Sequence, residues 1–291
     1  MASPMVSLQI LDRSTAAKEL DLASELFHRI NRVIPEDQKV LIIEPSYLVR
    51  DAIALMRRHG YSQIPVVQNG VVLGVFSYRS FAQGTVKTTL DEWQKQRCAP
   101  GDLWVEEFLE EFEFARVTDE MSRVFDAMDR DDGVIIGTPE SLVGILTPMD
   151  FLRYLYQVAS PFVMVSEIEL ALRALIRIAL GPEQIVVAAK RCLSSVYDEG
   201  RVPTCLEEMS FGDYQSLVSH GDNWKELESV FGGNRIRVSG KLKEVGDIRN
   251  DLFHFKREIT EEDRQTLNGH RNWLLNKIKQ VEARRRMEVQ P

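Results

Sequence analysis

Apolar residues in the first half of the chain recur at the spacing of helices and short strands. Residues 14–33 carry Leu, Phe and Ile at helical intervals, which predicts an amphipathic N-terminal helix with Ser14 as its N-cap. The apolar run 40–43 predicts a buried strand, and residues 49–58 predict a second helix. Residues 64–76 form two apolar runs around an Asn-Gly turn, a pattern typical of a β-hairpin.

The same pattern returns seventy residues further along the chain. Val66 in the first hairpin corresponds to Ile136, and the turn recurs at residues 138–140. The helix before the hairpin recurs at residues 120–129, after a slightly shorter link. A fixed internal period indicates a duplication, so two copies of one structural unit are expected.

Each copy ends in a hydroxyl residue followed three positions later by a second polar residue. These residues are Ser77 and Ser80 in the first copy, and Thr147 and Asp150 in the second. Together with the Ile-Pro-Val-Val and Gly-Val-Phe-Ser strands, the motifs resemble those of a tandem pair of CBS domains. The resemblance covers about residues 34–158.

The resemblance implies an α+β pair with repeats at about 34–86 and 102–158. In that family, clefts between the repeats bind adenosyl ligands, so the implied ligand is AMP, ADP, ATP or a related signalling nucleotide. The Ser or Thr hydroxyl would approach the phosphate, and the Asp would hold the ribose hydroxyls. The implied ligand-binding residues are Ser77, Thr147, Asp150, Ile64 and Pro65.

The two implied clefts are not equivalent. Ser80 stands in the first repeat where the family pattern has an acid, so one complete and one degraded cleft are expected. The residues also leave a purely structural role open for Asp150, as the N-cap of a helix over residues 151–157.

After Pro161 the apolar pattern becomes helical almost throughout. Residues 166–180 begin with Ser-Glu-Ile-Glu, a capping sequence, and end at Gly-Pro. Further helices are expected at 185–197, 211–218, 224–231, 235–255 and 260–286. Strand signals are nearly absent, so residues 162–291 are expected to form an all-α domain.

The charge of the chain is unevenly distributed. The net charge of −8 arises within residues 1–159, which hold 16 Lys and Arg against 24 Asp and Glu. Residues 160–291 hold 20 of each and contain basic clusters at 235–243 and 284–286. The neutral second half removes the objection that an acidic protein would repel nucleic acid.

Composition predicts a soluble cytoplasmic protein that has no membrane partner. No apolar stretch reaches the roughly 20 residues needed to span a bilayer, and the N-terminus does not resemble a secretory signal. The three cysteines, Cys98, Cys192 and Cys205, form no CxxC pair. This usage is typical of reduced thiols and argues against a zinc site.

One short motif in the helical half carries the chemistry of RNA cleavage. Arg249-Asn250-x-x-x-His254 combines a permanent cation with a group that exchanges protons near neutral pH. Its position on a long helix of an all-α domain resembles the HEPN superfamily, whose modules commonly dimerise and carry an Arg-x(4–6)-His motif. The opening residues 167–173 also resemble the first helix of such modules.

This second resemblance implies a metal-independent endoribonuclease that acts as a homodimer or higher homo-oligomer. His254 would be the general base or acid, Arg249 would stabilise the phosphorane, and Asn250 would orient the scissile phosphate. RNA would be the substrate, with no catalytic metal. Control by the nucleotide-binding pair suits a stress, toxin or phage-defence effector.

Helical geometry leaves alternatives open. Residues five apart lie about 140° apart around a helix, so Arg249 and His254 need a loosened helix end or a second subunit to form one site. In a structural alternative, Arg249 pairs with Asp247 or Asp251 and His254 caps the helix. The corresponding function is a non-catalytic nucleotide-sensing regulator whose helical domain dimerises or docks a partner.

Overall fold

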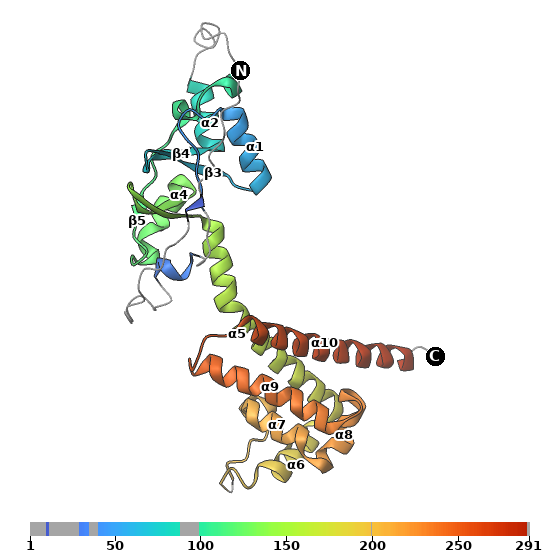
Figure 1. Cartoon of the computed structure of the whole chain (residues 1–291). Coiled ribbons are helices and arrows are strands. Elements are labelled where there is room, and N and C mark those ends of the chain that lie inside the picture. The colour runs from blue at the N-terminus through green and yellow to red at the C-terminus, as the bar shows by residue number, and fades with distance from the viewer. Residues whose placement is uncertain (1–9, 12–28, 35–39, 88–98, 199, 290–291) are drawn as a thin grey trace. The chain divides into compact units, whose positions relative to one another are not determined.

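The computed structural model describes residues 10–11, 29–34, 40–87, 99–198 and 200–289. The chain forms two compact units, Met1–Leu155 and Tyr156–Pro291. The first unit combines helices with short sheets, and the described part of the second unit is helical (Figure 1).

The first repeat is a helix followed by a β-hairpin and a second helix. Helix α1 runs from Val49 to His59, and the C-cap residue Gly60 closes it with a left-handed φ of 72°. The two hairpin strands pair antiparallel around the turn at Asn69 and Gly70, both of which have positive φ. The elements are β2 (Val40–Leu41), α1 (Val49–His59), β3 (Gln63–Gln68), β4 (Val71–Ser77) and α2 (Tyr78–Lys87).

The second repeat reproduces this order, and its first strand joins the sheet formed by the hairpin. A short strand lies parallel to the first hairpin strand and makes a three-stranded sheet in the order β5-β6-β7. The elements are β5 (Phe114–Ala115), α4 (Phe125–Asp131), β6 (Val134–Thr138) and β7 (Ser141–Leu146).

Strand register shows that the predicted duplication is real in three dimensions. Val66 pairs with Gly74 in the first hairpin, and Ile136 pairs with Gly144 in the second, seventy residues later. In both hairpins the register shifts at the residue that follows, after Val66 and after Ile136. The interval of 70 therefore holds for the strands, including the irregularity within each hairpin.

Two helical predictions in this unit need correction. The helix expected at 120–129 begins as a 3-10 helix (Met121–Val124) and becomes α-helical only at Phe125. Most of the helix expected at 14–33 lies outside the described residues, and its described end is a 3-10 helix (Ile30–Arg32). Further 3-10 turns lie at Pro100–Asp102 and Val105–Phe108.

Each repeat has its own apolar core, and a third cluster joins the two. Met56, Ile64 and Phe76 are fully buried in the first core, while the second core is built around Ile136 and Leu146. The joining cluster contains Val72 and Val75 from β4, Ile135 from β6 and the intervening Phe112. Burial of this apolar surface fixes the two repeats against each other within the unit.

In the residues described, the second unit is a bundle of six helices, the first of which begins in the first unit, with a 3-10 turn at Leu206–Glu208. Helix α7 begins with a capping box, in which Ser210 and Asp213 bond each other's backbone N–H groups. The largest fully buried side chain is Tyr214. The helices are α5 (Pro148–Ala179), α6 (Pro182–Leu193), α7 (Phe211–Ser219), α8 (Gly221–Phe231), α9 (Arg235–Phe253) and α10 (Glu261–Val289).

Helix α5 is continuous where two separate helices are expected. It runs through Pro161, so the Ser-Glu-Ile-Glu sequence at Ser166 lies inside a helix and does not begin one. A proline removes one helical hydrogen bond and crowds the preceding turn. Here Ser160, Val165 and Ile168 are buried around it, and this tertiary packing keeps the helix intact.

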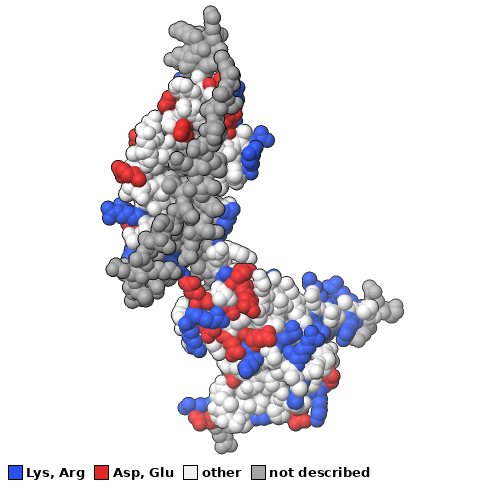
Figure 2. Space-filling model, viewed as in Figure 1, with Lys and Arg blue, Asp and Glu red and all other residues white. Residues whose placement is uncertain are grey.

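Helices α9 and α10 pack as an antiparallel pair. Glu244 Oε2 lies 2.7 Å from His270 Nε2, and Lys241 Nζ lies 5.3 Å from the centroid of the Trp273 ring. Residues that follow one another on α9 thus meet residues in reverse order on α10. Figure 2 shows Lys and Arg side chains gathered along the half of α10 that leads toward the C-terminus. No helix in the described ranges is both long and apolar enough to cross a membrane.

Candidate functional site

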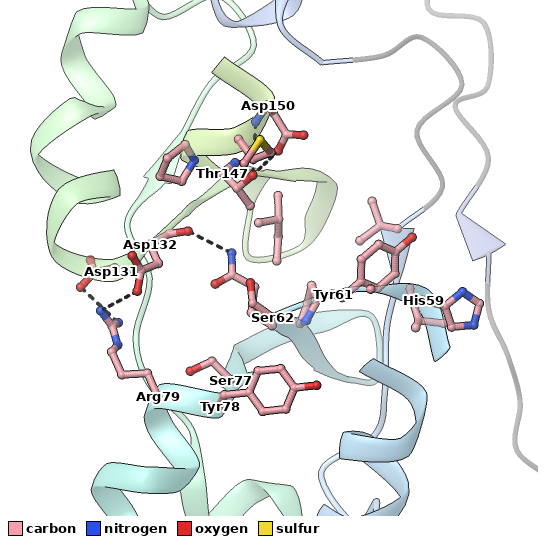
Figure 3. Close-up of a pocket in the computed structure, with 18 of the residues that line it drawn as sticks. His59, Tyr61, Ser62, Ser77, Tyr78, Arg79, Asp131, Asp132, Thr147 and Asp150 are labelled. Atoms are coloured by element: carbon pink, nitrogen blue, oxygen red, sulfur yellow. Dashed lines mark hydrogen bonds and ion pairs between the residues drawn. The ribbon is translucent and has the colours of Figure 1, made fainter. Parts of the chain in front are cut away.

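A cavity of about 760 Å³ lies within the first unit and receives residues from both repeats (Figure 3). Its walls come from the loop after α1, the junction of β4 with α2, the end of α4, and the junction of β7 with α5. This volume falls in the range of small-molecule sites, about 300–1,000 Å³. The cavity is the candidate ligand site of this unit.

The two polar motifs identified in the sequence form equivalent helix caps beside this cavity. Asp150 Oδ2 accepts hydrogen bonds from the backbone N–H of Thr147 at 2.9 Å and from its hydroxyl at 2.6 Å. Ser77 and Ser80 exchange the corresponding bonds, each backbone N–H donating to the other's hydroxyl at 2.9 Å. Each motif therefore closes the first turn of the helix that follows its hairpin.

Capping uses only one oxygen of Asp150. Its other oxygen, Oδ1, lies 3.6 Å from Nη1 of Arg153, which also lines the cavity. The carboxylate can accept further hydrogen bonds without losing its cap, because each oxygen has two lone-pair directions. A structural role and a ligand role for Asp150 are thus compatible.

The corresponding hydroxyl of the first repeat is already engaged. Ser77 is buried, and its hydroxyl donates to Oε1 of Glu110. The backbone of Glu110 pairs with Val75 on β4, which brings its carboxylate back toward the β4–α2 junction. Glu106, Glu107 and Glu111 of the same acidic run are exposed, and Glu110 differs from them because its carboxylate meets a cation.

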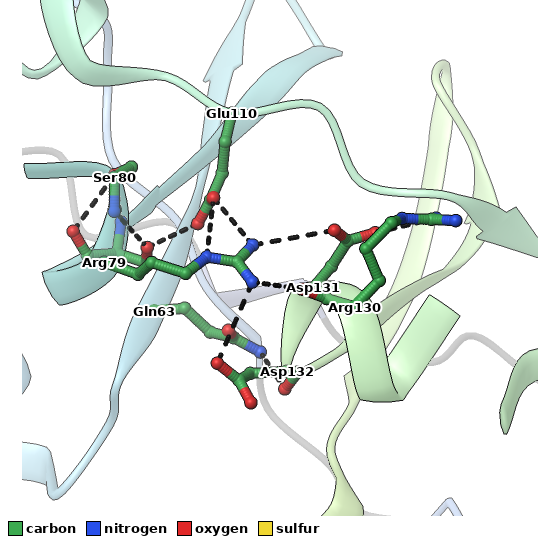
Figure 4. A network of polar contacts seen from close by, with 8 residues as sticks. Gln63, Arg79, Ser80, Glu110, Arg130, Asp131 and Asp132 are labelled. Atoms are coloured by element: carbon green, nitrogen blue, oxygen red, sulfur yellow. Dashed lines mark hydrogen bonds and ion pairs between the residues drawn. The ribbon is translucent and has the colours of Figure 1, made fainter. Parts of the chain in front are cut away.

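Arg79 is that cation, and it joins the two repeats (Figure 4). It donates from Nη2 to Glu110 Oε2 at 2.7 Å and from Nη1 to the backbone carbonyl of Arg130. Nη2 lies 3.6 Å from Asp131 Oδ1, and Nη1 lies 3.9 Å from Asp132 Oδ2. One guanidinium thus faces three carboxylates at the edge of the cavity.

Aromatic rings contribute to the apolar part of the cavity wall. Tyr61 and Tyr78 both line it, and each is 40% exposed. The ring of His59 stacks on that of Tyr61, with centroids 5.7 Å apart. Exposed aromatic faces beside charged groups can stack on a planar ring of a ligand.

The structure brings most of the expected ligand-binding residues together. Ser77, Thr147, Asp150 and Pro65 line the cavity, whereas Ile64 is fully buried in the first core and does not.

Sequence reasoning missed Arg79, Arg153, Asp131 and Asp132, all of which line the same cavity. Adding the interval of 70 to the loop before the first hairpin, for example to Tyr61, leads to Asp131 and its neighbour Asp132. The duplication could therefore have identified both Asp residues as candidates.

The Arg-Asn-His motif lies at the C-terminal end of α9. Asn250 and His254 are exposed, Arg249 is partly buried, and His254 is the residue at which the helix ends. Arg249 Nη1 donates to Asn250 Oδ1 at 3.3 Å, and its guanidinium lies 4.8 Å from the centroid of the Phe253 ring. Arg249 Nε is buried without a hydrogen-bond partner.

Arg249 forms no ion pair with either neighbouring acid, in contrast to the structural alternative. Asp251 instead pairs with Arg257, whose Nε lies 2.8 Å from its Oδ2. Arg257 also donates to both oxygens of Asp263 at the start of α10. These hydrogen bonds hold the pKa of Asp263 well below its usual range.

Family comparison identifies one module in the chain. Residues 34–84 match the CBS domain family. The chain therefore contains a CBS domain, and the match coincides with the first repeat of the cavity-forming unit. No curated protein matches the chain. No group of three or more His, Cys, Asp or Glu side chains that could hold a metal ion occurs among the residues whose placement is described.

Solved structures of CBS-domain proteins resemble part of the chain. Protein MJ1225 of Methanocaldococcus jannaschii is 21% identical over 44% of this chain, with a TM-score of 0.39, and the chain spans about half of its length (48%). A Bacillus anthracis CBS domain-containing protein is 17% identical, covering 44% of this chain and 91% of its own, with a TM-score of 0.36. CBSX2 in complex with AMP is 17% identical over 45% of this chain and 98% of its own, with a TM-score of 0.38.

Proposed function

We propose that the protein is a nucleotide-regulated ribonuclease. In this proposal, the cavity of the first unit binds an adenine nucleotide, and the Arg-Asn-His motif of the second unit cleaves RNA without a metal ion.

The observation that supports nucleotide binding is the composition of the cavity within a CBS-containing unit. Asp150 Oδ1 keeps acceptor capacity for a ribose hydroxyl, and the Thr147 hydroxyl lies beside it. Tyr61 and Tyr78 offer faces for a base, and Arg153 offers a positive charge for a phosphate. Base, sugar and phosphate can therefore each find a suitable partner.

The charges of the cavity favour a ligand with few phosphates. Arg79 and Arg153 are opposed by Asp131, Asp132 and Asp150, and Arg79 already faces Glu110 as well. A triphosphate brings more negative charge toward these carboxylates than a monophosphate does. AMP is therefore the expected ligand rather than ATP.

The observation that supports RNA cleavage is the state of Arg249. Its flanking Asp251 is held by Arg257, so the guanidinium has no carboxylate partner, and the exposed His254 follows five residues later. Contact with the Phe253 ring orients the guanidinium. An oriented, uncompensated cation suits the stabilisation of a phosphorane.

The proposed reaction needs one group that removes a proton and another that supplies one. The base takes the proton of the 2′-OH, and the 2′ oxygen attacks phosphorus. The bond from phosphorus to the 5′ oxygen breaks, and the acid protonates that oxygen, leaving a 2′,3′-cyclic phosphate and a 5′-OH. His254 of one copy supplies one role, and His254 of a second copy supplies the other.

Cleavage is tested on the full chain with total RNA, in EDTA, with and without AMP. Products with 2′,3′-cyclic ends are expected, DNA is expected to stay intact, and His254→Ala and Arg249→Ala should each slow cleavage at least about 10²-fold. Lys256→Ala, a change at a neighbouring exposed residue, is the matched control. A Mg²⁺ requirement, or full activity in the His254 variant, would place the chemistry elsewhere.

A second candidate function is a nucleotide-sensing regulator whose helical unit dimerises or docks a partner. The surroundings of the motif favour it, since residues 244–263 hold seven acidic residues and only three basic ones. Nucleotide binding without RNA cleavage under any nucleotide condition would select this function.

A further inference from the structure

Antiparallel packing of α9 and α10 unites two basic clusters that lie apart in the sequence. Residues 235–243 contain four Lys or Arg and no acidic residue, and residues 277–286 contain five Lys or Arg and one acidic residue. The Lys241 ammonium lies over Trp273, and the Lys277 ammonium lies against Gly232, where a β-carbon would be 3.0 Å from Nζ. We call the Lys and Arg residues of these two ranges the basic surface.

The cations of the basic surface differ from several others on the second unit, which are held in ion pairs. Within the described residues, no carboxylate lies within 4.0 Å of any of them, although ion pairs occur at Arg191–Glu226, Lys225–Asp222 and Arg271–Glu167. An uncompensated group of like charges raises the local concentration of counter-ions. The basic surface therefore has its charge available for an external anion.

Charge also changes along the pair of helices. The basic surface begins at one end of α9, and the acid-rich residues 244–263 surround the Arg-Asn-His motif at the other end. Figure 2 shows the basic side chains along α10 toward the C-terminus and acidic ones where α10 begins. A polyanion would gain its binding free energy from the basic surface and little from the motif.

We propose that the basic surface binds the phosphate backbone of single-stranded RNA and leads the strand to the Arg-Asn-His motif. The delivery step rests on the proposed ribonuclease function, whereas binding does not. At about 1.5 Å per residue, the distance along α9 from Arg235 to His254 is roughly 28 Å. At about 3.4 Å per nucleotide, a strand of about eight nucleotides spans this distance.

Recognition of phosphate alone predicts little selectivity between RNA and single-stranded DNA in the binding step. Contacts to phosphate carry no information about base or sugar, so single-stranded DNA should bind about as well as RNA. Only the cleavage step needs the 2′-OH. Binding without cleavage of DNA is therefore part of the expected behaviour.

The test measures binding on full-length His254→Ala protein, which separates affinity from cleavage. The probe is a labelled 12-nucleotide single-stranded RNA followed by fluorescence anisotropy at several salt concentrations. The patch variant reverses three exposed charges of the basic surface, Arg237→Glu, Lys243→Glu and Lys279→Glu. The control variant reverses three exposed charges elsewhere on the same unit: Lys190→Glu, Arg201→Glu and Lys225→Glu.

The patch variant should bind at least about tenfold more weakly than the control, although the net charge change is identical. Its slope of log affinity against log salt should fall by about 2, because each lost phosphate contact removes about 0.7. A four-nucleotide RNA should bind the unaltered surface weakly, because it contacts only part of it.

Equal affinity in the two variants would overturn the proposal. So would a patch variant that changes from dimer to monomer in sedimentation while its RNA affinity stays unchanged, because the surface would then contact a second copy. Tight binding by the basic surface in a protein that never cleaves RNA would instead remove the ribonuclease function and the delivery step, and leave RNA binding by the basic surface standing.

Discussion

The side chain of Gln63 occupies the space that a β-carbon on Gly133 would need. The two residues hold equivalent positions in the two repeats, seventy apart, and the Gln63 amide also donates to the backbone carbonyl of Asp132 at 3.4 Å. Gln63 is buried, so its amide has little room to move. The repeats therefore meet at a point where the first contributes a long side chain and the second contributes none.

Gly133→Ala should destabilise the first unit by about 1–3 kcal/mol, as overpacking of a tight site does. The added methyl would also lie 3.1 Å from Phe112 Cε2 and 3.3 Å from the Leu146 carbonyl oxygen. Removing the opposing side chain with Gln63→Ala should restore part of the loss. Urea unfolding of both single variants and the double variant gives the coupling energy, and simple additivity would show that the contact is unimportant.

Asp150 is predicted to have two separable roles. Asp150→Ala removes the helix cap and the ribose acceptor, so AMP affinity should fall at least tenfold, given roughly 1.5–3 kcal/mol for a charged hydrogen bond. Asp150→Asn keeps an oxygen that can accept from Thr147, so it should spare stability and lose part of the affinity. Calorimetry and thermal unfolding of each variant separate the two effects.

Ser80→Ala is the matched control for this pair, because it removes the equivalent cap of the first repeat without touching the cavity lining. It should lower stability by about 1 kcal/mol and leave AMP binding unchanged. The wild-type protein should also prefer AMP over its 2′-deoxy form. Unchanged affinity in both Asp150 variants would exclude this carboxylate from the ligand site.

Asp132 is predicted to set the preference among nucleotides. Its side chain is 70% exposed at the cavity edge, so Asp132→Asn should remove a negative charge with little effect on folding. ATP affinity should rise about 1.4- to fivefold, in line with 0.2–1 kcal/mol for an exposed charge interaction, and AMP affinity should rise less. Asp126→Asn, an exposed change outside the cavity, is the control. An equal gain for both nucleotides would contradict the charge argument.

The parts of the fold that were predictable are those determined locally. The first hairpin follows from two apolar runs around an Asn-Gly turn, and the second follows from the repeat of those runs seventy residues later. The duplicated Ser77 and Thr147 motifs mark the helices that follow the hairpins. Helix α7 is likewise determined by its own capping box at Ser210. In each case the residues that specify the structure are neighbours in the sequence.

The parts that were not predictable depend on distant partners. Pro161 predicts a helix boundary by its own chemistry, but burial of the flanking residues keeps α5 continuous. By its sequence neighbours, Glu110 belongs to an acid-rich, solvent-facing run. In the structure its carboxylate binds Arg79, which lies more than thirty residues earlier in the chain. Near the motif, the partner of Asp251 could not be chosen from sequence, because Arg257 reaches it from beyond the helix end.

That same Arg257 gives the stability of the α9–α10 connection a defined pH dependence. Its hydrogen bonds are the main cause that lowers the pKa of Asp263, and the Thr260 backbone N–H, 2.8 Å from Asp263 Oδ2, also lowers it. A carboxyl with a depressed pKa in the folded state contributes stability that is fully present above its unfolded pKa of about 3.9. The contribution is lost as pH falls from that value through the lower folded pKa.

Arg257→Gln should therefore lower the free energy of unfolding at pH 7, and its difference from wild type should shrink below about pH 4. Urea unfolding from pH 2 to 7, followed by the fluorescence of Trp224 and Trp273, measures this difference. Arg264→Gln, which removes a nearby exposed pair with Glu261, should have a smaller effect at pH 7. A difference that stays constant across the pH range would show that Arg257 stabilises the connection by packing rather than through Asp263. Released from Arg257, Asp251 could also pair with Arg249, so the same variant should lose RNA cleavage if that guanidinium must stay uncompensated.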